Sequence, residues 1–120
     1  MTAGLVAAGS VRATAAGTVV YEVNLDLDAT IRDDYLAWLD AHIAEICALP
    51  GFTGARLFEV ADPAAATGRV SLCVQYALRD QAALDAYLRD HAPRLRADGI
   101  AKFGDRFRAS RRVLVANEPA

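Results

Sequence analysis

Apolar and polar residues alternate at two different periods along residues 18–116, and these periods define the expected elements. A period of two is typical of strands, and steps of three and four residues are typical of helices. We expect four strands, at residues 18–25, 52–60, 69–78 and 107–115. We expect helices at residues 30–49 and 80–91, and a further helical turn that begins at Pro93 and runs through Leu95, Ile100 and Phe103.

The helix at residues 30–49 has the clearest pattern. Its apolar face is made by residues at helical spacing: Ile31, Tyr35, Trp38, Leu39, His42, Ile46 and Leu49. We expect it to begin at Thr30, with Asp33 as the partner in a capping box, and to end before Pro50. Asp26 and Asp28 are expected to serve the turn and the helix start, and Asp80 is expected to cap the second helix.

The order of these elements is β-α-β-β-α-β, which predicts an α+β, ferredoxin-like fold with helices on one face of a four-stranded antiparallel sheet. The opposite face would carry a mixed set of side chains: Glu22, Asn24, Arg56, Phe58, Ser71, Cys73, Gln75, Arg108 and Ser110. This open face is too mixed for a core and too apolar in places for free solvent. We therefore predict a homodimer that forms through it. Strict alternation places Asn24 on this face, although a β-bulge would reverse its direction.

The 120 residues fit one domain, with a flexible leader at residues 1–17, a domain at residues 18–116 and a tail at residues 117–120. No apolar run approaches the roughly 18 residues of a membrane span, and the leader lacks the charge pattern of a secretory signal. The net charge of −2 gives no basic field that would attract nucleic acid or an anionic membrane. Cys47 and Cys73 form no CxxC motif, which favours a reducing cytoplasm.

Charge is distributed unevenly along the chain. Residues 22–62 hold nine acidic residues and two arginines, whereas residues 94–112 hold seven basic residues and two aspartates. The basic stretch has the chemistry to hold a carboxylate or phosphate, or else it pairs with the acidic half within or between subunits. No HxH, HExxH, GxGxxG, GxxxxGKS or GxSxG pattern is present, so we expect no metal and no cofactor.

Aromatic side chains from several elements are expected to face the space between the helices and the sheet. They are Tyr21, Tyr35, Trp38, Tyr76 and Tyr87. Arg94 and Arg111 would add polar groups for a ligand, and His42 and His91 are the candidate catalytic bases. The alternative interpretation is a filled aromatic core in which both histidines are structural.

Five segments of the chain resemble a known family. They are Val20-Tyr-Glu-Val-Asn-Leu25, Pro50-Gly-Phe52, Val74-Gln-Tyr76, Ala86-Tyr-Leu88 and Phe107-Arg-Ala-Ser-Arg-Arg112. The chain resembles domain-of-unknown-function family 4286 from residue 19 to about residue 114. This resemblance implies a bacterial protein of the dimeric α/β-barrel superfamily. That superfamily includes cofactor-free monooxygenases, haem-degrading monooxygenases, lactone isomerases and ligand-binding stress proteins.

The haem-degrading branch of that superfamily uses an Asn, a Trp and a His. By position these correspond to Asn24, Tyr87 and Ala97 in this chain, so one of the three is retained. Two hypotheses follow for the function. The first is a cytoplasmic dimer that binds a small aromatic or anionic molecule, and that acts, if catalytic, as a cofactor-free oxygenase or isomerase. The alternative is a non-catalytic module for dimerisation or protein interaction, with the aromatic cleft closed.

Overall fold

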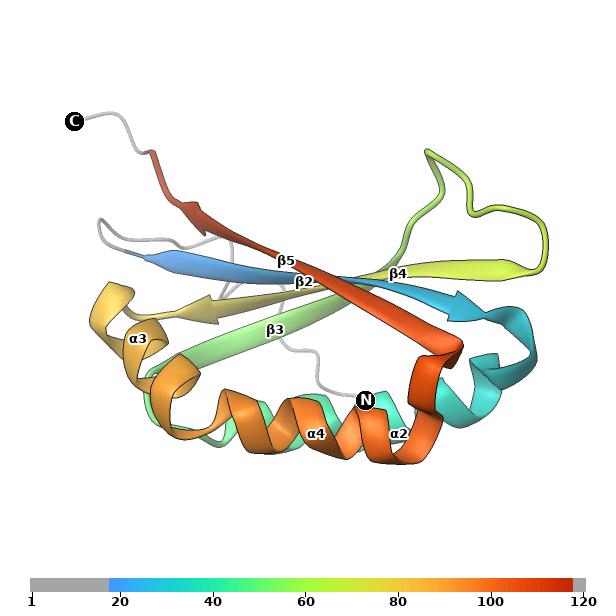
Figure 1. Ribbon diagram of the computed structural model, residues 1–120. Helices are drawn as coiled ribbons and strands as arrows, with labels where there is room; N and C mark the ends of the chain where they lie inside the picture. The colour runs from blue at the N-terminus through green and yellow to red at the C-terminus, as the bar shows by residue number, and fades with distance from the viewer. Residues whose placement is uncertain (1–17, 118–120) are drawn as a thin grey trace.

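Four antiparallel strands form one sheet in the computed structural model, which describes residues 18–117 (Figure 1). The strand order is β3-β4-β2-β5, so β3 and β5 are the edge strands. In chain order the elements are β2 (Val19–Asp28), the short 3-10 helix η1 (Ala29–Ile31), α2 (Arg32–Cys47), β3 (Phe52–Glu59), β4 (Arg69–Leu78), α3 (Gln81–Asp90), α4 (Ala92–Phe103), η2 (Gly104–Arg106) and β5 (Phe107–Val115). The expected leader at residues 1–17 and most of the expected tail, residues 118–120, lie outside the described residues.

The predicted β-α-β-β-α-β order is confirmed, and β4 and β5 have the predicted bounds. β2 is longer than predicted, because its pairing with β4 continues to Asp28 opposite Arg69. Leu27 is fully buried and extends the apolar face of the strand. Asp26 does not serve the turn as predicted. Its carboxylate instead accepts a hydrogen bond of 2.9 Å from Arg69 Nε, which ties together the paired ends of β2 and β4.

The first helix begins differently from the prediction. Asp28 is the capping residue, because its Oδ1 accepts hydrogen bonds from the backbone N–H of Thr30 at 2.9 Å and from the Thr30 hydroxyl at 2.7 Å. The predicted capping box of Thr30 and Asp33 is therefore wrong, and η1 precedes the α-helix that starts at Arg32. The predicted cap of the second helix is confirmed, since Asp80 Oδ1 accepts a hydrogen bond of 2.8 Å from the N–H of Ala83.

The helical turn expected after Pro93 is a complete helix of 12 residues, α4. The chain leaves α-helical geometry at His91, where φ is −128°, and Pro93 then occupies the first turn of the new helix. Proline is favoured at that position because the N–H it lacks would have no partner within the helix. The structure therefore has three α-helices among the described residues rather than two and a turn.

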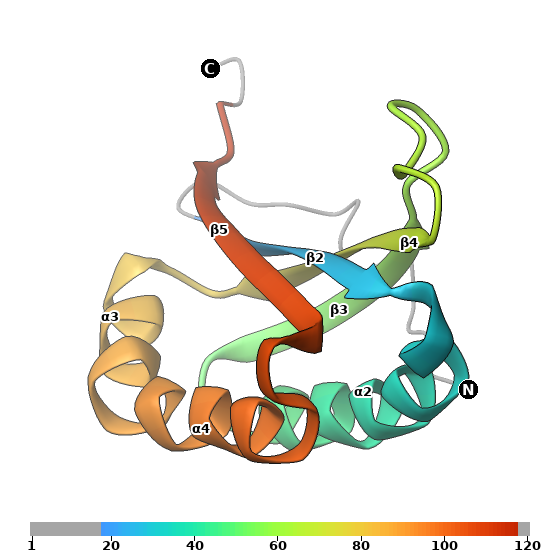
Figure 2. The same cartoon turned by 45° about the vertical axis from the view of Figure 1, so that its right-hand side comes forward.

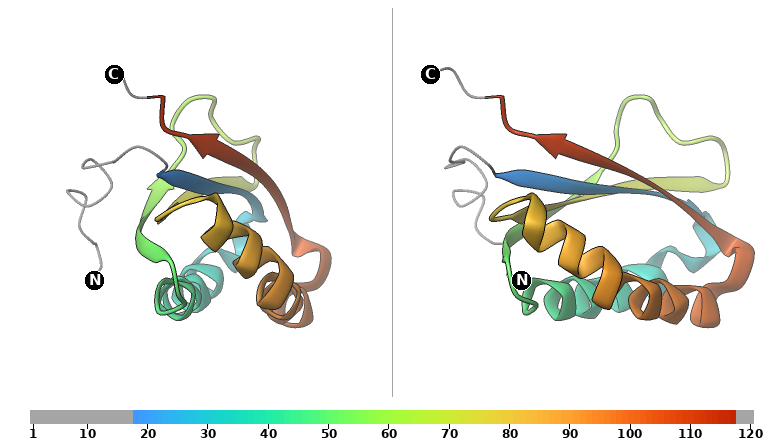
Figure 3. Two further views of the ribbon diagram at one scale, coloured as in Figure 1. Left: turned by 90° about the vertical axis from the view of Figure 1, so that its left-hand side faces the viewer. Right: turned by 60° about the vertical axis from the view of Figure 1, so that its left-hand side comes forward.

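All of these helices lie on one side of the sheet (Figure 2; Figure 3, left). The side chains of β2 and β4 that point to the helices form the centre of the core: Val19, Tyr21, Leu25, Leu27, Leu72, Val74, Tyr76 and Leu78. The turn from α2 to β3 places Gly51 at a φ of +88°, a conformation that glycine adopts without strain. A Cβ at Gly51 would collide with the Cβ of Ala83, so this glycine also lets α3 pack closely against the turn.

The opposite face of the sheet has no helix over it and carries the predicted mixed set of side chains. Asn24 pairs with Cys73 and Ser110 in a regular register, and the one irregularity among the described strand pairs lies in β3, between Phe52 and Gly54. The Asn24 amide donates a hydrogen bond of 2.8 Å to Glu22 Oε2. Asn24 therefore points away from the helices, as strict alternation predicts.

Candidate functional site

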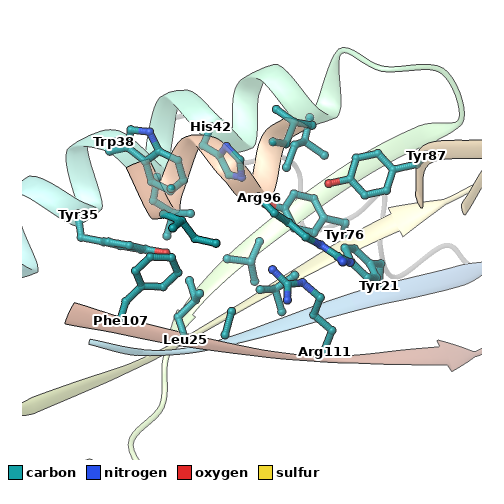
Figure 4. A pocket seen from close by; sticks show the side chains of 18 of the residues that line it. Tyr21, Leu25, Tyr35, Trp38, His42, Tyr76, Tyr87, Arg96, Phe107 and Arg111 are labelled. Atoms are coloured by element: carbon teal, nitrogen blue, oxygen red, sulfur yellow. The ribbon is translucent and has the colours of Figure 1, made fainter. Parts of the chain in front are cut away.

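A cavity of about 560 Å³ lies between the sheet and the helices (Figure 4). Its wall includes residues of β2, β4 and β5 on the sheet side, and of α2, α3, α4 and η2 on the helix side. Pockets that hold small organic ligands have volumes in this range, and their walls combine apolar surface with a few polar groups. The aromatic space that the sequence predicts is therefore only partly filled by the protein's own side chains.

Aromatic rings make one end of the cavity. Tyr35 packs against Trp38 and Phe107, with ring centroids 5.4 Å and 5.3 Å apart. Trp38 in turn stacks on His42, with centroids 4.3 Å apart and an interplanar angle of 21°. The three side chains of α2 are three and four residues apart, which places them on one helix face.

Gly99 brings α4 close to this aromatic end. A Cβ at this position would lie 3.1 Å from Cη2 of Trp38, which is tighter than ordinary contact, and 3.5 Å from Cζ of Phe107, which is ordinary contact. The missing side chain therefore lets the helix approach the indole. Leu95, one turn earlier in α4, is buried and also lines the cavity.

Tyrosine side chains make the other end of the cavity (Figure 4). The Tyr21 ring lies 6.2 Å from the Tyr76 ring and 5.8 Å from the Tyr87 ring, and each of the three residues is at most 5% exposed. Burial raises the pKa of Tyr87 to about 12 and that of Tyr76 well above its ordinary value. Both phenols are therefore neutral at physiological pH and keep their O–H groups as hydrogen-bond donors.

Two arginines extend into the cavity at the tyrosine end. Arg96 of α4 donates a hydrogen bond of 2.9 Å from its Nη2 to the Tyr21 hydroxyl oxygen. Arg111 of β5 lines the same cavity and acts electrostatically on Tyr35 and Tyr87. Figure 4 shows the Arg96 side chain reaching Tyr21, and the Arg111 side chain rising from β5 toward the middle of the cavity.

His42 lies beside Trp38 at the aromatic end of the cavity (Figure 4). Burial lowers the pKa of its imidazole, and the carboxylates of Glu45 and Asp98 oppose this effect only in part. No residue within the described range 18–117 forms a hydrogen bond with its ring nitrogens. The imidazole is therefore neutral near pH 7, with a nitrogen available to accept a proton.

The cavity includes seven of the nine predicted site residues. They are His42, Tyr21, Tyr35, Trp38, Tyr76, Tyr87 and Arg111. His91 and Arg94 do not line it. His91 lies at the junction of α3 and α4, and Arg94 Nη1 forms a salt bridge of 3.1 Å with Glu45 Oε2 on the surface.

Arg96 is a cavity residue that the sequence analysis missed. The signal was present in the chain, because Arg96, Gly99 and Ile100 are three and four residues apart and share a helix face. It was missed because only a short helical turn was expected after Pro93. Of the two roles considered for the basic stretch, pairing with acidic residues is confirmed for Arg94 and Arg112, and Arg96 and Arg111 line the cavity.

Other kinds of site find no support within the described residues. No group of three or more His, Cys, Asp or Glu side chains in residues 18–117 is placed to hold a metal ion. No helix in the same range is long and apolar enough to cross a membrane. Asn24, the one match to the haem-degrading pattern, lies on the open face of the sheet and does not reach the cavity.

The fold and the cavity together define a ferredoxin-like α+β protein with a partly open pocket that is lined by aromatic and aliphatic side chains. Residues 18–116 match the model of a family described as a domain of unknown function, DUF4286, and the chain belongs to this family. No functionally curated protein matches the chain.

Several solved structures have a similar fold. Rv0793 from Mycobacterium tuberculosis is 25% identical, with a TM-score of 0.61 over 86% of this chain and 98% of that chain. SnoaB from Streptomyces nogalater, described as a cofactor-independent oxygenase, is 15% identical, with a TM-score of 0.58 over 87% of this chain and 97% of its own. A dimeric ferredoxin-like protein from an uncultured marine organism is 12% identical, with a TM-score of 0.51 over 86% of this chain and 98% of its own. These similarities establish the ferredoxin-like fold.

Proposed function

We propose that this protein binds a small aromatic molecule in the cavity and removes a proton from it, with His42 as the base. The observation that supports this proposal is the position of His42. Its ring lines the cavity, is oriented by stacking on Trp38, and has no hydrogen-bond partner among the described residues. A base held in this way is both neutral and accessible to a bound ligand.

Proton removal by His42 leads to two cofactor-free reactions. Loss of a proton from a phenol or an activated C–H group leaves an electron-rich anion. That anion transfers an electron to dioxygen, which begins an oxygenation, or it is protonated at another carbon, which completes an isomerisation. The similar fold of SnoaB, a cofactor-independent oxygenase, favours the first of these. The neutral tyrosines and the aromatic wall would hold the planar ligand in place.

The test compares the two histidines of the chain. Glutamine at position 42 should abolish oxygen uptake with a panel of hydroquinones and naphthols but leave ligand binding intact, because Gln is polar and cannot accept a proton at neutral pH. His91→Gln is the matched control, since His91 does not line the cavity. The wild-type rate should rise with pH through a pKa below the ordinary 6.5, because burial lowers the pKa of His42. The proposal is wrong if no panel member at millimolar concentration changes the spectrum of Trp38.

We propose further that the protein is a homodimer formed through the open face of the sheet. Support comes from the partly apolar character of that face, where Phe58 and Cys73 are paired across β3 and β4 beside Glu22. The dimeric ferredoxin-like protein of similar fold also supports it. Phe58→Asp should yield monomers in sedimentation equilibrium, whereas Leu57→Asp, on the other face of the same strand, should not. A wild-type protein that is monomeric at micromolar concentration would contradict this proposal.

We assign the protein to the cytoplasm. Both Cys47 and Cys73 are free thiols, which suits a reducing compartment. Fractionation of cells that produce the untagged chain would test this assignment, and recovery outside the cytoplasmic fraction would contradict it.

A further inference from the structure

Two arginines that line the cavity, Arg96 and Arg111, are exposed to solvent and form no salt bridge with another residue in the described part of the chain. Six other arginines lie within 4.0 Å of an acidic side chain: Arg32, Arg69, Arg79, Arg89, Arg94 and Arg112. Arg56, Arg106 and Arg108 also lack such a salt bridge, but of the unpaired arginines in residues 18–117 only Arg96 and Arg111 line the cavity. Asp105 also lines the cavity, but it lies in η2, two residues before Phe107 of the aromatic end.

Hydrogen-bond donors converge at the same end. Arg96 donates to the oxygen of Tyr21, so the hydroxyl hydrogen of Tyr21 remains free to donate to another group. The hydroxyl of Tyr87, whose side chain is buried, has no hydrogen-bond partner among residues 18–117 and points into the cavity (Figure 4). Buried polar groups normally have partners, so a buried donor that points into the cavity suits a hydrogen-bond acceptor on a ligand.

We propose that the natural ligand is an aromatic acid, and that Arg96 and Arg111 bind its carboxylate between them. This inference rests on the proposed function and names the class of its ligand. Planar guanidinium groups match the geometry of a carboxylate, and the hydroxyls of Tyr21 and Tyr87 supply further donors to its oxygens.

The two ends of the cavity then orient the ligand. With the carboxylate at the arginines, the aromatic ring extends toward Tyr35 and Trp38 (Figure 4). His42 lies beside Trp38 at the aromatic end, so it faces the ring of the ligand rather than its carboxylate. The proton removed by His42 is accordingly one on or near the ring, and the carboxylate serves for binding and orientation.

The test uses two probes of the same shape, naphthoate and naphthamide, which differ in charge. Binding is followed by calorimetry and by the indole N–H signal of Trp38, which is the single tryptophan of the chain and therefore gives a single peak. The wild-type protein should bind the acid at least about tenfold more tightly than the amide, as expected for charge-assisted hydrogen bonds. Arg96→Gln and Arg111→Gln should each lower the affinity for the acid by about tenfold and leave the affinity for the amide unchanged.

Arg94→Gln is the matched control, because Arg94 lies on the same helix as Arg96 but pairs with Glu45 on the surface. It should leave both affinities unchanged. The variant Arg111→Lys keeps the positive charge and should retain a preference for the acid, which guards against a loss caused by misfolding. Equal binding of the two probes, or equal loss of both in the arginine variants, overturns the acid-binding role and leaves the aromatic cavity as a binding site. An unchanged indole signal with both probes at millimolar concentration overturns the proposed function, and the acid-binding role with it.

Discussion

Replacement of Glu22 by glutamine should destabilise the protein more than a substitution on the surface usually does, although Glu22 lies on the open face of the sheet. The Glu22 side chain is only 4% exposed. Its Oε2 accepts hydrogen bonds of 2.7 Å from Arg112 Nε and 2.8 Å from Asn24 Nδ2, and its Oε1 accepts one of 3.1 Å from Gln75. Glutamine has nearly the same shape, but its amide group would present N–H donors to partners that are themselves donors.

The size of the effect follows from the pKa. The hydrogen bonds from Arg112 and Asn24 lower the pKa of Glu22 from 4.5 to about 2, against the opposing effect of burial. At about 1.4 kcal/mol for each tenfold change in proton affinity, this corresponds to about 3 kcal/mol. The Arg112 side chain is 65% exposed, so solvent screens part of the attraction. We expect Glu22→Gln to lower the free energy of unfolding by about 2 kcal/mol at pH 7.

The pH dependence has a definite sign. The pKa of Glu22 is lower in the folded protein, so its contribution is complete above about pH 4.5 and is lost as the pH falls toward 2. The free energy of unfolding of the wild type and the variant is measured by urea denaturation, followed by circular dichroism. The measurements are made at pH 7 and at pH 3, at one protein concentration. Glu59→Gln is the control, because that side chain is 62% exposed and pairs with a partly exposed Arg32. A loss at pH 7 no larger than that of the control, or an equal loss at both pH values, would refute the reasoning.

Three further predictions concern one helix cap and two glycines at close contacts between elements. Asp80→Ala should cost about 1 kcal/mol in thermal unfolding, because the N–H of Ala83 loses its capping acceptor. Gly51→Ala should cost more than 1 kcal/mol in the same assay, because of the positive φ and the collision with Ala83; a change within error would contradict this packing. Gly99→Ala should displace the indole of Trp38 and change its near-ultraviolet circular dichroism while the far-ultraviolet spectrum stays the same, and an unaltered near-ultraviolet signal would contradict the close approach of α4.

The fold could be predicted largely from the sequence because its signals are local. Alternation in β2 and β4 places Tyr21 and Tyr76 on the helix side, and the spacing of Tyr35, Trp38 and His42 places them on one helix face. Both patterns follow from backbone geometry alone. Arg94 was predicted to line the cavity and does not, and Arg96 lines it but was not predicted. Both lie in α4, for which only a helical turn after Pro93 was expected rather than a complete helix.

The existence and size of the cavity could not be predicted in the same way. A tyrosine or tryptophan on the apolar face of a helix or strand either fills a core or lines a pocket. Which of the two occurs depends on the distance between the helix layer and the sheet. That distance depends on contacts between elements far apart in the chain, such as Gly99 against Trp38. Whether an arginine points inward also depends on its partners. Arg94 forms a salt bridge with Glu45 on the surface, whereas Arg96 donates a hydrogen bond to the Tyr21 hydroxyl oxygen in the cavity.

The strand β5 forms both an edge of the sheet and part of the wall of the partly open cavity. β5 contributes Phe107, Ala109 and Arg111 to the cavity wall, yet it pairs with a strand on one side only, β2. Local opening requires least free energy where backbone hydrogen bonds are fewest, so we expect the wall to open here. A brief detachment of β5 from β2 would then widen the mouth of the cavity, where Ile100 is already exposed, and a bound ligand would oppose it. Hydrogen exchange at β5 should therefore slow when a ligand is bound, whereas exchange at the central strand β4 should stay the same.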